Sequence, residues 1–231
     1  MGTKYYNNYR EFVNVDLALQ EIEHLSAAQV NTIVDRAVAR YSQDVPQRKA
    51  LRVTGDGSYR YTLPSDWDSN FSYIELIEYP DREQNITKMR TIDWLIHDSG
   101  DGNGEKIHLR DISPSTSDTF TVHYVIQHAV TETSSTISDS DFDAVGYLVA
   151  SRVCLALAGR ALRTRDSRHT TDITNFRTIS DEYRSMAKDY YDQYKQIIGL
   201  PEKGILPANV VSDIDVTPPW IIGGYLTHGR R

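Results

Sequence analysis

Cysteine is almost absent from this 231-residue sequence, which contains only Cys154. A single cysteine cannot form an internal disulfide, so no such cross-link holds the fold. Cys154 lies between Val153 and Leu155 in an apolar helical pattern, which predicts a buried thiol rather than a nucleophile. Stability is therefore expected to come from a noncovalent hydrophobic core.

Long apolar runs are also lacking. The opening residues 1–12, MGTKYYNNYREF, have no apolar stretch like that of a secretory leader, and no segment comes near the ~20 apolar residues that cross a bilayer. Tyr6 stands where N-myristoylation after Gly2 requires Ser or Thr. We therefore expect a protein made and used in cytoplasm, with no membrane contact.

Basic residues are fewer than acidic ones. There are 25 Lys and Arg residues against 32 Asp and Glu residues, and the formal net charge of −7 has the wrong sign for binding phosphates over a broad surface. We therefore expect no sequence-specific binding of nucleic acid. Apolar residues make up 39% and charged residues 25%, fractions typical of a folded globular protein.

Catalytic and metal-binding motifs are missing as well. Neither GxSxG nor HExxH occurs, and the Gly-rich run 99–106 fails as a phosphate loop and carries Arg110 where a calcium loop requires Glu. His108 and His123 could be neighbours across two strands, but a lone pair is more typical of a surface contact than of a zinc site. The sequence predicts no enzymatic activity, no metal and no cofactor.

The N-terminal part predicts two helices. Asp16 is placed to cap a short helix over residues 17–25, and Ser26 with Gln29 forms a capping-box pattern that opens a second helix to about Tyr41. The second helix has an apolar face at three- and four-residue steps, formed by Val30, Ile33, Val34, Ala37, Val38 and Tyr41. This face predicts packing against another element.

Two longer helices are predicted further along the chain. One runs from about 138 to 163, with Asp141 and Asp143 in its first turn, where carboxylates complement the helix dipole. Its apolar residues form two stripes, Phe142, Val145, Val149, Val153 and Ala156 on one and Leu148, Leu155 and Leu162 on the other. We therefore expect burial on two sides. The last helix covers about 173–198 and is stopped by Gly199.

Between these helical parts the pattern changes to short alternating runs broken by Gly, Pro and Asp, which favours strands. LRVT and YRYTL flank the turn 55–57 as in a hairpin, and KIHL and TFTVHYVIQ flank residues 111–118. YIELIEY alternates over residues 73–79. A small antiparallel sheet is predicted.

The order of elements predicts an α+β fold, with a helical bundle of about four helices, an inserted small antiparallel β domain and an extended C-terminal arm. We divide the chain into an N-terminal arm and helices (1–47), the β insertion (48–131), a helix pair packing on the N-terminal helices (132–199) and an extended docking arm (200–231).

The C-terminal segment has no sustained period, and it carries large apolar residues that it cannot bury by itself. Such residues commonly insert into a partner. The predicted partner-binding residues are Trp220, Ile221, Ile222, Tyr225, Arg230 and Arg231. The alternative is a tail folded back over its own domain. Fifteen tyrosines, many for this length, also favour subunit contacts.

Three segments carry most of a resemblance that covers roughly residues 15–200. EKIHLRDISP (105–114), TFTVHYVIQ (119–127) and SDFDAVGYLVASRV (140–153), taken in this order after N-terminal helices, resemble the adaptor proteins that attach beneath the portal ring of tailed bacteriophages. These adaptors are head-tail connectors. The likeness lies in the order and style of the elements.

The resemblance implies a structural virion protein that forms a homo-oligomeric ring, often a dodecamer, in the neck of the particle. Its partners would be its own copies, the portal protein and tail or neck proteins, and DNA would pass through the lumen during ejection. A tail-completion or terminator ring protein shares this profile. A third alternative is a β domain that binds carbohydrate or peptide, with Trp67 and Trp94 as candidates, although Trp94 reads as a core residue.

Overall fold

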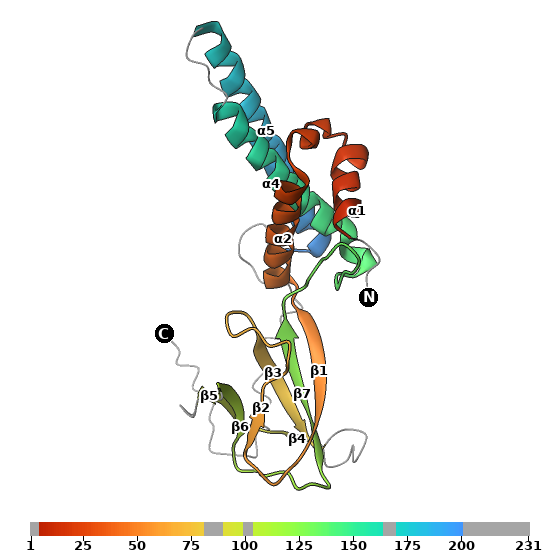
Figure 1. Cartoon of the computed structure of the whole chain (residues 1–231), viewed down its shortest axis with the longest axis vertical. Helices are drawn as coiled ribbons and strands as arrows, with labels where there is room; N and C mark the ends of the chain where they lie inside the picture. The colour runs from red at the N-terminus through yellow and green to blue at the C-terminus, as the bar shows by residue number, and fades with distance from the viewer. Residues whose placement is uncertain (1–4, 81–89, 99–103, 164–169, 201–231) are drawn as a thin grey trace, which may run out of the picture.

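The computed structural model describes residues 5–80, 90–98, 104–163 and 170–200. Figure 1 shows an elongated molecule, with a helical region at one end and a β region at the other. The α+β architecture predicted from the sequence is confirmed. Residues 201–231, which make up nearly all of the predicted C-terminal arm, lie outside the described residues.

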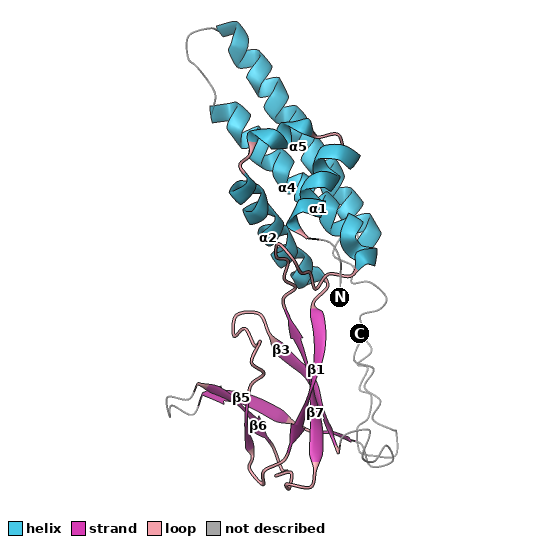
Figure 2. Ribbon diagram, turned by 45° about the vertical axis from the view of Figure 1, so that its right-hand side comes forward, coloured by secondary structure: helices cyan, strands magenta, loops and turns pink. Residues whose placement is uncertain are grey.

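The helical region is built from both ends of the described chain. Its elements are α1 (Tyr6–Glu11), η1 (Phe12–Asp16), η2 (Gln20–His24), α2 (Ala27–Asp44), η3 (Asp139–Asp141), α4 (Phe142–Arg163) and α5 (Thr170–Ile198). The helices α4 and α5 lie side by side along most of their length (Figures 1 and 2). The two long helices predicted from the sequence are thus present.

Helix α4 is the centre of the helical core. Its buried residues include Val145, Leu148, Val149, Val153 and Leu157, which pack with residues of α1, η1, α2 and α5. By length and composition alone, Asp139–Leu162 could cross a membrane, although we expected no segment to come near that length. Since 61% of its most apolar window is buried inside the protein, the feature is that of a core helix.

At Gly146 the segment η1 packs closely against α4. A Cβ atom built at this position would lie 2.6 Å from the ring of Phe12, which packs edge-on against Tyr147 and Phe142. Only glycine therefore lets η1 lie this close to α4.

The N-terminal segment corrects one prediction. The short helix expected over 17–25 with Asp16 as its cap is wrong, because α1 and the π-helical turn η1 precede it and only a 3₁₀ turn follows. Ala18 breaks the chain direction with a positive φ of 51°. Burial of Phe12 and Val13 against α4 outweighs the local capping pattern.

The start of α2 is as predicted. Gln29 N–H donates to Ser26 Oγ at 3.3 Å, and Ser26 N–H donates to Gln29 Oε1 at 2.9 Å. This reciprocal capping box satisfies two backbone donors at the helix start. The helix continues to Asp44, three residues beyond the predicted end at Tyr41.

The β region contains two antiparallel sheets rather than one. Its strands are β1 (Gln47–Thr54), β2 (Arg60–Thr62), β3 (Tyr73–Tyr79), β4 (Arg90–Thr91), β5 (Trp94–Asp98), β6 (Glu105–Leu109) and β7 (Thr119–Ile126). The order is β1-β7-β3-β4 in one sheet and β2-β6-β5 in the other. Tyr61 and Phe120, from different sheets, meet edge-to-face at 4.8 Å and share one core.

Both hairpins predicted from the sequence are wrong. Strand β1 pairs with β7 along its whole length, from Gln47 opposite Ile126 to Thr54 opposite Thr119, and β2 pairs with β6. Instead of turning back, the chain passes from one sheet to the other at Gly55, where a Cβ would lie 2.4 Å from the carbonyl oxygens of Pro114 and Ser115. Two crossing segments meet there.

Candidate functional site

Buried phenol groups in the helical region have structural partners. Tyr41 Oη donates to Asp141 Oδ2 at 2.7 Å, and Tyr194 Oη donates to Asp44 Oδ2 at 2.6 Å. Burial, reinforced by these carboxylates, raises the pKa of both tyrosines well above the ordinary value, so both remain neutral donors. These contacts join α2 to η3 and α5.

Cys154 is buried, as predicted. Burial and the nearby Glu21 carboxylate raise the pKa of the thiol to about 12, so it stays protonated at neutral pH. A protonated thiol is a poor nucleophile. Within the described ranges, no three His, Cys, Asp or Glu side chains are grouped to hold a metal ion.

The two histidines considered as cross-strand neighbours do not face each other. His108 is on β6, where its ring lies 6.5 Å from Tyr59, whereas His123 is on β7 in the other sheet and lies 3.3 Å from Glu78. The prediction of adjacency failed because it assumed that β6 and β7 form one hairpin.

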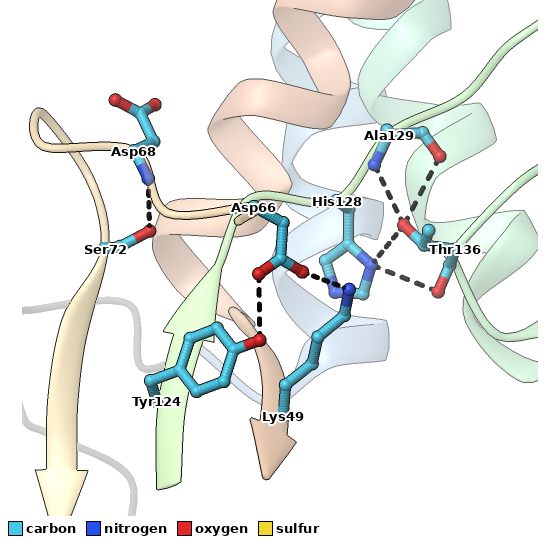
Figure 3. A network of polar contacts seen from close by, with 8 residues as sticks. All are labelled: Lys49, Asp66, Asp68, Ser72, Tyr124, His128, Ala129 and Thr136. Carbon is cyan, nitrogen blue, oxygen red and sulfur yellow. Dashed lines mark hydrogen bonds and ion pairs between the residues drawn. The ribbon is translucent and has the colours of Figure 1, made fainter. Parts of the chain in front are cut away.

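A polar network lies where the helical and β regions meet (Figure 3). Asp66 accepts hydrogen bonds from Lys49 Nζ at 2.5 Å and from Tyr124 Oη at 2.8 Å. The Lys49 ammonium holds the pKa of Asp66 below its usual range, and burial with the Asp66 contact raises the pKa of Tyr124 to about 12. The network ties the loop before β3 to β1 and β7.

His128 completes this junction on the side of the helices. Its Nδ1 lies 3.2 Å from both the carbonyl and the hydroxyl oxygen of Thr136, its backbone N–H donates to Ser42 Oγ at 2.9 Å, and its ring lies 5.1 Å from that of Tyr41. Burial lowers the pKa of His128, so the neutral ring is favoured. The junction thus positions the sheet relative to α2.

The tryptophans proposed for ligand stacking are not free platforms. Trp67 and Trp94 are half-buried and pack against the β core, and the centroid of the Trp67 ring lies 6.4 Å from that of Tyr124. The other predicted binding residues lie outside the described residues, namely Trp220, Ile221, Ile222, Tyr225, Arg230 and Arg231.

One candidate binding surface is a groove along α4, with α5 on one side and the start of α2 on the other. One hollow of about 340 Å³ is lined by α4 and α5 residues including Leu148, Leu155 and Tyr191. A second, of about 510 Å³, is lined by Leu155 and Gly159 of α4 with Leu25, which follows η2, and Gln29 of α2. Because they share Leu155, we treat them as one feature, the α4 groove.

Leu155 is the exception to the predicted burial of α4 on two sides. The side chain is 54% exposed at the centre of the α4 groove, although Leu148 on the same stripe is buried. The stripe itself could be found from the helical period, but its exposure could not, because exposure depends on which neighbours pack beside it.

Basic side chains border this apolar floor. Arg152 lies on the floor with its Nε buried and without a hydrogen-bond partner among the described residues. Burial lowers its pKa, and the nearby Arg36 and Arg40 of α2 lower it further. Arg184 and Lys188 line the α5 side. The α4 groove is therefore basic in a chain whose net charge is −7.

A second, smaller patch lies on the three-stranded sheet. Tyr59 and Leu95, which are 52% and 45% exposed, border a hollow of about 420 Å³ together with His108 and Arg110. This patch has two exposed large apolar side chains, whereas the α4 groove has Leu155 and more basic side chains around it.

Neither a protein-family model nor a curated protein sequence matches the chain.

Proposed function

We propose that this chain is a structural assembly protein, a subunit of a ring that connects the portal of a bacteriophage head to the tail and surrounds the path of the DNA. The observation that carries the proposal is the α4 groove, where Leu155 is 54% exposed beside a buried, unpaired Arg152 Nε. Exposed apolar surface bordered by charge is typical of a protein–protein interface.

The elongated shape suits a connecting role. The β region extends away from the helical region (Figure 2). The α4 groove can form contacts between subunits, and the patch around Tyr59 and Leu95 can meet another component. An acidic balance, with a net charge of −7, favours a channel to which DNA does not adhere.

The segments that resemble phage adaptors also have a clear place in the molecule. Residues 105–127 contain β6 and β7, and residues 140–153 contain the first half of α4. They include β7, which leads back to the helical region, and the part of the α4 groove floor formed by Leu148 and Arg152. The position of these segments supports a role in assembly for β7 and for the α4 groove.

The test is to purify the full chain and examine it by mass photometry and electron microscopy, alone and with portal-bearing heads that lack tails. We expect closed rings, alone or on the portal vertex. A folded chain that stays monomeric in both conditions would overturn the proposal. Attachment to free tails instead of heads would identify a tail-completion or terminator ring.

A further inference from the structure

A second edge of the molecule complements the α4 groove. Residues 11–23 contain four carboxylates, Glu11, Asp16, Glu21 and Glu23, and no basic residue. All four are exposed. Val15, among them on η1, is the most exposed large apolar side chain of the described residues, at 64%. We call η1 and η2 with these side chains the acidic edge.

The η1 part of the acidic edge and the centre of the α4 groove lie on opposite sides of α4, whereas η2 continues around the helix to the second hollow, where Arg160 donates a hydrogen bond to the carbonyl of His24. Phe12 of η1 packs on Gly146, whereas Leu155 lies at the centre of the groove. The separation is 155 − 146 = 9 residues, or about two and a half turns at 3.6 residues per turn, so the two positions point in opposite directions. Val15 on η1 therefore cannot reach Leu155 of its own copy.

We infer that the acidic edge of one copy docks into the α4 groove of a second copy, with Val15 against Leu155 and the carboxylates facing Arg152, Arg36 and Lys188. The inference rests on the proposed function in that it describes the contact within the ring. Two different surfaces on opposite sides make a head-to-tail contact, the kind that generates closed rings.

Charge identifies a second copy as the occupant. The groove contains Arg152, whose buried Nε lacks a partner among the described residues, and it is bordered by Arg36 and Lys188. Other basic side chains there already have contacts, since Arg40 pairs with Asp44 at 3.1 Å and Arg184 with Asp181 at 3.7 Å. An occupant must therefore supply both carboxylates and an apolar side chain, and the acidic edge supplies both.

The test uses engineered cysteines in the full chain. Val15→Cys and Leu155→Cys are purified separately, mixed in equal amounts and oxidised with oxidised glutathione; Cys154 is buried and does not compete. We expect disulfide-linked dimers in the mixture at a yield at least tenfold above either variant alone. Tyr59→Cys, 52% exposed on the β region, is the matched control and should give no such product with either partner.

Charge reversal sharpens the result. Arg152→Glu places a carboxylate near Arg36 and Arg40, so the monomer should remain folded, as circular dichroism will verify. When Arg152→Glu is combined with Leu155→Cys, the yield of cross-linking to Val15→Cys should fall at least tenfold. When Asp16→Arg is then added to the Val15→Cys chain, most of the cross-linking yield should return. Arg60→Glu, an exposed reversal on β2, should change nothing.

Each other outcome separates this inference from the proposed function. Strong self-dimers of Leu155→Cys would indicate a two-fold contact and overturn the inference. A mixed product that forms only after deletion of residues 201–231 would mean that this segment occupies the groove, which also overturns it. If rings formed without the mixed product, the proposed ring would stand and this contact would be refuted. Neither rings nor product would refute both.

Discussion

The helical and β regions bury their apolar surface in different ways. In the β region two sheets face each other, so Tyr61, Ile107 and Phe120 are covered from both sides within the same chain. In the helical region α4 is covered by α5, α2 and the α1–η1–η2 segment, while the side that carries Leu155 stays open. The difference teaches that an apolar stripe on a central helix can continue beyond the core that covers it, whereas the exposed Tyr59 and Leu95 of the β region lie apart from the core that the two sheets share.

The largest test of this comparison is Phe120→Ala, because Phe120 is fully buried between the sheets. Removing a buried aromatic ring leaves a cavity that costs about 3–5 kcal/mol. We expect hydrogen exchange measured by mass spectrometry to show lost protection in β1, β3 and β7 and retained protection in α4 and α5.

The control for this variant is Tyr73→Ala on β3, where the side chain is 51% exposed. It should change the free energy of unfolding by less than about 1 kcal/mol. If Phe120→Ala removed protection equally from helices and strands, the two regions would form one cooperative unit and the comparison would fail.

The second test concerns the closed side of α4. Gly146→Ala should destabilise the helical region by about 1–3 kcal/mol, because the added Cβ would press on the Phe12 ring. Gly159→Ala, in the same helix, meets nothing within 4 Å and should stabilise by roughly 0.5–1 kcal/mol through helix propensity. Thermal melts at 222 nm compare the two variants. Equal shifts of the same sign would contradict the packing described at Gly146.

The smallest effect concerns pH at the junction. Because burial lowers the pKa of His128 below its ordinary 6.5, the unfolded chain takes up a proton that the folded chain does not. Stability should therefore be complete above about pH 6.5 and fall as the pH drops below it. Between pH 7.5 and 5.5 we expect the Tm of the wild type to fall roughly 1 °C more than that of His128→Gln.

The control is His97→Gln, an exposed histidine on β5, which should keep the pH slope of the wild type. Equal slopes in the wild type and in His128→Gln would show that this ring does not couple the two regions to pH.

Local signals in the sequence predicted the helices well. The Ser26 and Gln29 capping box and the long apolar periods of α4 and α5 act over a few residues, and the structure confirms the helices they indicate. Strand partners were not predictable in this way. The partners Gln47 and Ile126 are 79 residues apart (126 − 47), and no turn chemistry connects them.

The binding surfaces were predictable only in part. The stripe through Leu148 and Leu155 was recognised as apolar, but the sequence did not show that Leu148 is buried and Leu155 is exposed among the described residues. Arg152 gave no signal, since one arginine in an apolar helix reads as solvated. The expected anchors around Trp220 lie outside the described residues and remain predictions.

The joint between the two regions has a mechanical consequence. Strand β1 leaves α2 after only Val45 and Pro46, and the paired strand β7 returns to the helices at the same level, with Gln47 opposite Ile126. A single backbone connection would let the β region rotate relative to the helical region. Two adjacent connections allow bending about one axis and resist twisting of one region against the other. A twist applied at the strand tips is thereby delivered to α2 and, through the 2.7 Å contact between Tyr41 and Asp141, to the start of α4.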